Sequence, residues 1–86
     1  MSQNWLNLDG KVAIVTGGAS GIGKHIAQSL VQVGATAVVV DMNVQTGTEA
    51  EGVFYVQCDV TDRTSVQAMV DLVVEKYGKI DALVNN

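Results

Sequence analysis

A glycine cluster between an apolar run and a helical repeat limits the folds that this chain can adopt more than any other feature of its sequence. The apolar run is Val12 to Val15, within a predicted strand from Lys11 to Thr16, and the glycines fall within Gly17 to Gly23. The positions that then recur at helical spacing are Ile22, Ile26, Leu30 and Val33. This order predicts a strand that turns at once into a helix through a tight loop. The unpaired N–H groups of the first helical turn would then point beyond the end of the strand.

Short β-branched runs alternate with stretches of helical period along the rest of the chain, which is the pattern of parallel βαβ units. We predict strands over residues 36–40, 53–58 and 82–84, and a long helix that Gly78 ends. Residues 42–52 carry two glycines and weak periodicity, so any helix there is limited to one or two turns. The predicted fold is α/β, the first half of a doubly wound parallel sheet with strand order 3-2-1-4.

The composition favours a single folded domain and excludes several classes of function. Apolar residues make up 48% of the chain and charged ones 16%, a composition unlike that of a disordered chain. A chain of 86 residues is also too short to form a second core. The net charge is -4 and the five cations never form a run, so we expect no nucleic-acid partner. The apolar runs fall far below the roughly 20 residues of a membrane span, so we expect no membrane partner either.

Two further features bear on the compartment. No positive charge precedes Lys11 and no long apolar stretch follows the start, so we expect no secretory signal. Cys58 is the only cysteine, which allows no intrachain disulfide and fits a reducing environment. We therefore expect a cytoplasmic protein.

The glycine loop is suited to hold a phosphate. Its glycines would let a pyrophosphate approach the backbone, and the start of a helix presents roughly half a positive charge. Asp41 ends the second predicted strand about twenty residues further on, where a carboxylate can accept hydrogen bonds from both hydroxyls of a ribose. The loop and the acid together predict a dinucleotide site rather than a plain turn.

A P-loop is the competing interpretation of the same glycines. Gly18 to Lys24 matches G-x-x-x-x-G-K, but His25 follows where a Ser or Thr hydroxyl should coordinate magnesium. A P-loop also leaves Asp41 without a role. A nucleotide hydrolase is therefore kept as the lesser alternative.

The run Thr-Gly-Gly-Ala-Ser-Gly-Ile-Gly at 16–23 resembles the cofactor loop of the short-chain dehydrogenase/reductase family. Asp59-Val60 and Asn85-Asn86 fall where the adenine-site and strand-four motifs of that family lie. The resemblance covers the chain from about Leu8 onward and implies a Rossmann-type fold of the classical type. Residues 5–41 are also similar to the bacterial sorbitol-6-phosphate 2-dehydrogenases of the family.

The resemblance implies a nicotinamide dinucleotide as cofactor and assigns its contacts. Ser20 and Ile22 would lie near the phosphates and ribose, Asp59 would face the adenine amino group, and Val60 would lie beside the ring. The predicted cofactor-binding residues are Gly17, Ser20, Gly21, Ile22, Gly23, Asp41, Met42, Asp59, Val60 and Asn86.

We predict that the cofactor is NAD rather than NADP. NADP would place a phosphate beside Asp41, and two like charges about 4 Å apart repel by about 4 kcal/mol at an effective dielectric constant of 20. Members of the family that prefer NADP usually carry a basic residue just before the middle glycine or just after the second strand. This chain has Ser20 and Met42 at those positions.

The resemblance also implies hydride transfer between the nicotinamide and a secondary alcohol or ketone, with a Tyr-x-x-x-Lys motif helped by Ser and Asn. Asp59 follows Tyr55 by four residues and Asp81 follows Tyr77 by four, so neither tyrosine has that lysine. We therefore assign no catalytic residue and no metal ligand within the 86 residues. We expect the catalytic half to follow in a longer single-domain enzyme, of which residues 1–86 are the NAD-binding segment.

The expected partner is a small alcohol or ketone, such as a sugar-alcohol phosphate of the sorbitol 6-phosphate kind. By analogy with the family we expect a homo-oligomer, commonly a tetramer, with the helix that carries Val66 to Tyr77 contributing to the interface. A non-catalytic dinucleotide-binding module, complete as it stands, is the alternative from another functional class.

Overall fold

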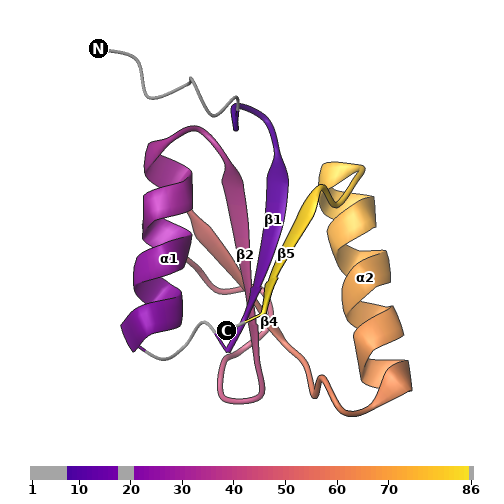
Figure 1. Cartoon of the computed structure of the whole chain (residues 1–86). Coiled ribbons are helices and arrows are strands. Elements are labelled where there is room, and N and C mark those ends of the chain that lie inside the picture. Colours follow the sequence, from indigo (N-terminus) through magenta and orange to yellow (C-terminus); the bar gives the residue numbers. More distant parts are fainter. Residues whose placement is uncertain (1–7, 18–20, 86) are drawn as a thin grey trace.

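The computed structural model describes residues 8–17 and 21–85, which form a five-stranded sheet with one helix on each face (Figure 1). The elements in chain order are β1 (Val12–Thr16), α1 (Gly21–Gln32), β2 (Thr36–Asp41), β3 (Glu49–Ala50), β4 (Val53–Gln57), α2 (Arg63–Tyr77) and β5 (Ala82–Asn85). Neither helix is long and apolar enough to cross a bilayer in the part of the chain described.

The strands lie in the order β3-β4-β2-β1-β5. The four parallel strands confirm the predicted order 3-2-1-4, and β3 is an additional short strand that pairs antiparallel with β4. Because the parallel strands run in one direction, their carboxyl ends meet at a single edge of the sheet, which is the lower edge in Figure 1. The chain leaves β1 toward β2 on one side and returns to β5 on the other, so the winding reverses beside β1.

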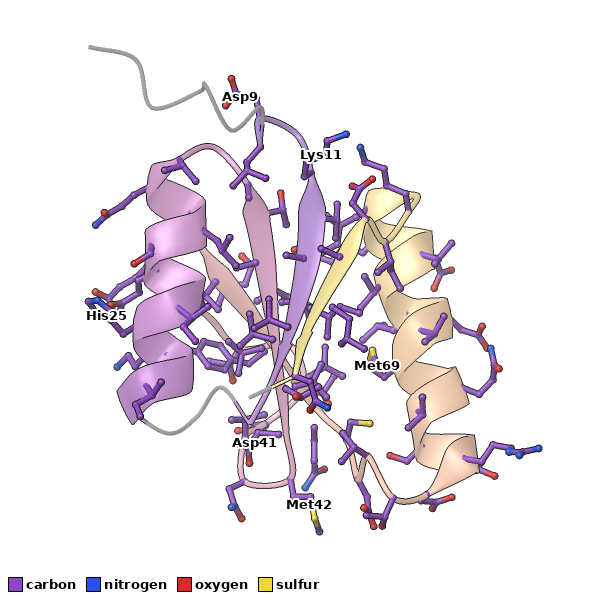
Figure 2. All side chains as sticks on the ribbon, viewed as in Figure 1. Asp9, Lys11, His25, Asp41, Met42 and Met69 are labelled. Atoms are coloured by element: carbon purple, nitrogen blue, oxygen red, sulfur yellow. The ribbon has the colours of Figure 1, made fainter. Side chains whose placement is uncertain are left out.

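The central strands are buried on both faces, which accounts for their continuous apolar runs. Ile14 belongs to the core cluster on the α2 side of the sheet, and Met69 projects from α2 into that cluster (Figure 2). The next residue along β1, Val15, packs on the opposite face with Ala27 of α1. One sheet therefore separates two cores, and the alternation along each strand decides which core a side chain joins.

Both ends of α2 are capped, and the carboxyl end lies at Gly78 as predicted. Asp62 is the N-cap residue, and its Oδ1 accepts a hydrogen bond from the N–H of Thr64 at 3.0 Å. Gly78 adopts a left-handed conformation with φ at 85°, and its N–H donates to the carbonyl oxygen of Val74 at 2.7 Å.

The segment between β2 and β4 contains no helix, whereas the sequence of residues 42–52 is compatible with one or two helical turns. Gly47 and Gly52 have φ values of 95° and 80°, which interrupt a helical path. The N–H of Gly47 donates to the carbonyl of Tyr55 at 3.0 Å, and the N–H of Tyr55 donates to the carbonyl of Thr48 at 2.9 Å. The segment thus satisfies its backbone groups by folding back on β4.

Candidate functional site

A hollow with a volume of about 310 Å³ opens at the carboxyl edge of the sheet. It lies at the ends of β1, β2, β4 and β5, where the winding reverses, and this is where ligands bind in open α/β sheets. Its lining residues are Thr16, Gly17, Val40, Asp41, Met42, Asn43, Cys58, Asp59, Val60, Thr61 and Asn85.

Half of the predicted cofactor-binding residues line this hollow, namely Gly17, Asp41, Met42, Asp59 and Val60. Three others form the first residues of α1, namely Gly21, Ile22 and Gly23. Ser20 and Asn86 lie outside the described residues. The structure therefore brings together residues that are far apart in sequence. Gly17 and Asp59, for example, line the same hollow although more than forty positions separate them.

The end of β1 is tied to both neighbouring strands. Gly17 has φ at 66°, a conformation that favours glycine, and its N–H donates to the carbonyl of Val40 in β2 at 2.9 Å. On the other side, the Thr16 hydroxyl donates to Oδ1 of Asn85 in β5 at 3.0 Å. The chain therefore leaves the sheet toward α1 from a fixed position.

The first turn of α1 carries an exposed residue, Ile22, and has unfilled space beside Gly21. Ile22 is 72% exposed, whereas Gly23 is buried. A Cβ placed on Gly21 would meet no described atom within 4 Å. His25 lies further along the helix and points away from the sheet (Figure 2). The start of the helix thus leaves room for a ligand to approach the backbone.

Asp41 ends β2 at the rim of the hollow, next to Met42, and Figure 2 shows both at the lower edge of the sheet. Oδ1 of Asp41 accepts a hydrogen bond from the N–H of Asn43 at 2.9 Å. Met42 is 58% exposed, and its carbonyl accepts a hydrogen bond from Nε2 of Gln57 at 3.1 Å. The loop after β2 is therefore held against the end of β4.

Asp59 follows β4 and also lines the hollow. Its Oδ1 accepts hydrogen bonds from the hydroxyl of Thr61 at 2.6 Å and from the N–H of Thr61 at 3.0 Å. The hydroxyl bond above all, and then the backbone bond, lower the pKa of Asp59 below its ordinary value. The side chain is therefore an ionised hydrogen-bond acceptor at neutral pH.

Six lining residues were not predicted as site residues, namely Thr16, Val40, Asn43, Cys58, Thr61 and Asn85. Each lies within two residues of a predicted site residue, so the positions around the carboxyl ends of the parallel strands could have indicated them. Cys58 is 2% exposed, and its N–H donates to the carbonyl of Asp41 at 3.1 Å, which joins the two strand ends. Within residues 8–17 and 21–85, no three metal-ligating side chains come together as a metal site.

Residues 11–86 match the family described as short chain dehydrogenase. This chain belongs to that family. It is 43% identical to zerumbone synthase of Zingiber zerumbet, covering 94% of this chain and 33% of that protein. It is 37% identical to 15-hydroxyprostaglandin dehydrogenase [NAD(+)] of Rattus norvegicus, covering 94% of this chain and 34% of that protein.

Among solved structures, the chain is similar to a hydroxysteroid dehydrogenase from Escherichia coli, with 37% identity and a TM-score of 0.85. That match covers 100% of this chain and 39% of the other. The chain thus spans about a third of the length of the curated relatives that it matches.

Membership in the short chain dehydrogenase family bears on how the glycines are interpreted. It favours the dinucleotide loop over the P-loop, because the whole stretch from the glycines to the end of β5 matches as one unit. The three relatives named above give no support to the narrower resemblance to sorbitol-6-phosphate dehydrogenases.

Proposed function

We propose that this chain is the NAD-binding part of an oxidoreductase that transfers a hydride between NAD and a secondary alcohol or ketone. The observation that carries the proposal is the position of Asp41, at the carboxyl end of β2 and on the rim of a hollow shared with Gly17 and Asp59. When bound, NAD supplies the nicotinamide ring that gives or takes the hydride.

The residues present fit the adenosine diphosphate part of such a cofactor. The Asp41 carboxylate is suited to accept hydrogen bonds from the two ribose hydroxyls. The open space at Gly21 suits a diphosphate at the positive end of α1. Asp59 is an ionised acceptor, which matches the amino group of adenine.

The charges around the hollow support NAD over NADP. Asp41 and Asp59 are acids, and no Lys or Arg occurs among the described residues that line the hollow. A phosphate on the ribose would therefore meet a carboxylate without a compensating cation. Even half of the repulsion estimated above, about 2 kcal/mol, corresponds to roughly thirtyfold in affinity.

The catalytic residues are proposed to lie in the remainder of a longer enzyme, since the relatives are about three times as long as this chain. Tyr77 supports this assignment, because burial raises its pKa, whereas a tyrosine that exchanges protons near neutral pH needs a lowered pKa. We propose a small alcohol or ketone as substrate, with a sugar-alcohol phosphate as one instance, a homo-oligomeric assembly and a cytoplasmic location.

The test is to titrate the full-length protein with NAD and NADP side by side in a calorimeter. We expect NAD to bind roughly thirtyfold more tightly. Tighter binding of NADP would overturn the proposal. A protein that binds NAD but oxidises none of a panel of secondary alcohols would instead favour the non-catalytic module.

A further inference from the structure

The side chain of Asp59 is held by one residue through one of its two oxygens. Both hydrogen bonds described for this carboxylate end on Oδ1, and both donors belong to Thr61, the hydroxyl at 2.6 Å and the N–H at 3.0 Å. Asp59 and Thr61 both line the hollow at the carboxyl edge. Among the described residues, Oδ2 receives no hydrogen bond.

The backbone of Asp59 is fixed separately, by α2 and the turn before it. Its N–H donates to the hydroxyl of Ser65 at 2.9 Å, and its carbonyl accepts from the N–H of Asp62 at 3.0 Å. These bonds fix where the residue sits but leave its carboxylate free to rotate. The bonds from Thr61 are the ones that set the direction of the carboxylate.

We propose that Thr61 is a positioning residue that aims Asp59 at the 6-amino group of adenine and so makes the site select adenine over 6-oxopurines. This inference rests on the proposed function. With Oδ1 occupied by two donors, Oδ2 is the oxygen presented to a ligand. An ionised carboxylate accepts a hydrogen bond from an amino group but repels the lone pairs of a 6-oxo group. A carboxylate that is free to turn would discriminate less.

The probe is a pair of cofactors that differ only at this position, NAD and nicotinamide hypoxanthine dinucleotide. The dissociation constant of each is measured by calorimetry on the full-length protein. A hydrogen bond to a charged group contributes about 1.5–3 kcal/mol, so we expect the unaltered protein to prefer NAD by about 10-fold to 150-fold.

Four variants separate positioning from folding. Thr61→Val and Thr61→Ala remove the hydroxyl and leave the N–H, whereas Thr61→Ser restores a hydroxyl. Asp62→Ala is the matched control, because it removes the cap of α2 and leaves both donors to Asp59 in place. Thermal unfolding of each variant identifies which of them are folded at the temperature of the titration.

We expect Thr61→Val and Thr61→Ala to reduce the preference for NAD by about three- to tenfold, since one of two donors is lost. Thr61→Ser and Asp62→Ala should keep the full preference. An unchanged preference in either folded variant that lacks the hydroxyl overturns the inference, and so does an equal loss in Asp62→Ala. Failure of the unaltered protein to bind NAD would instead remove the proposed function itself.

Discussion

The two edges of the sheet are built in opposite ways. At the amino edge, the Asp81 carboxylate accepts from the N–H of Val12 at 2.8 Å, and the N–H of Asp81 donates to the carbonyl of Val12 at 2.8 Å. Lys79 adds an ion pair to the same carboxylate at 3.2 Å. At the carboxyl edge, a glycine turn and two acids surround a hollow. Figure 2 shows the two edges at opposite ends of the molecule, with Lys11 at one and Asp41 at the other.

This difference predicts that residues at the amino edge serve the fold and that residues at the carboxyl edge would serve a ligand. Polar groups at the amino edge bond to the backbone of neighbouring strands and fix the register of β5 on β1. At the carboxyl edge, the loops after β2 and β4 donate hydrogen bonds to Asp41 and Asp59, and both acids line the hollow. Substitutions at the first edge should therefore change stability, and substitutions at the second should change cofactor affinity.

The largest expected effect is on the choice of cofactor. Asp41→Ala should remove the roughly thirtyfold preference for NAD over NADP, because the repelling charge is lost. The free energy of unfolding should fall by about 1 kcal/mol, because the carboxylate that accepts from the N–H of Asn43 is also lost. Calorimetric titration with both cofactors measures the preference. A variant that still prefers NAD as strongly would show that Asp41 does not face the ribose.

Gly21→Ala at the carboxyl edge should weaken NAD binding by about tenfold, because a methyl group would stand where the diphosphate approaches. The folded chain has room for that methyl group, and alanine suits a helix better than glycine, so stability should be unchanged or slightly higher. Calorimetry and urea unfolding measure the two quantities. Unaltered affinity would place the diphosphate elsewhere.

Gly34→Ala is the same substitution near the amino edge, and we expect the opposite result. Gly34 has φ at 95°, and a Cβ there would overlap the carboxylate of Asp9. The unfolding free energy should fall by about 1 kcal/mol or somewhat more. NAD affinity should stay the same in the folded variant. A change in affinity without a change in stability would break the distinction between the edges.

The smallest expected effect is a pH dependence at the amino edge. The hydrogen bond from Val12, and to a lesser extent Lys79, hold the pKa of Asp81 below its ordinary value. A lowered folded-state pKa stabilises the protein above the unfolded pKa of about 4, and that stability is lost as the pH falls through the folded pKa.

Asp81→Asn should therefore lower the urea midpoint at neutral pH and flatten the loss of stability below about pH 4. Part of the dependence of the unfolding free energy on pH should remain in this variant, because the pKa of Asp59 is also lowered. Urea unfolding across the acid range provides the measurement. If the unfolding free energy of the variant falls with pH as steeply as that of the unaltered protein, Asp81 does not contribute to this pH dependence.

Much of the fold could be predicted from sequence, because each central strand is buried on both faces and so must be apolar throughout. The strands at Val12–Thr16 and Thr36–Asp41 are cases in point. The segment at 42–52 could not be predicted well, because its conformation depends on bonds to Tyr55 in β4 and not on a local repeat.

The candidate site likewise has a part that sequence could predict and a part that it could not. The places of Asp41 and Asp59 could be predicted, because one ends a strand and the other follows one, and the carboxyl ends of these parallel strands share one edge. The role of Thr61 could not, because it depends on where a rotatable hydroxyl points in the folded turn. Sequence spacing locates an acid at a site, but the direction of its carboxylate is set by neighbours in space.

The most direct test of the account is an amide NMR titration of the folded protein with NAD. We expect the amides of Gly21, Gly23, Asp41 and Thr61 to shift with a single dissociation constant. The hollow of about 340 Å³ at the amino end of β4, lined by Ala50, Gly52 and Val53, should not respond. Shifts confined to that second hollow, with the carboxyl edge unaffected, would contradict the account.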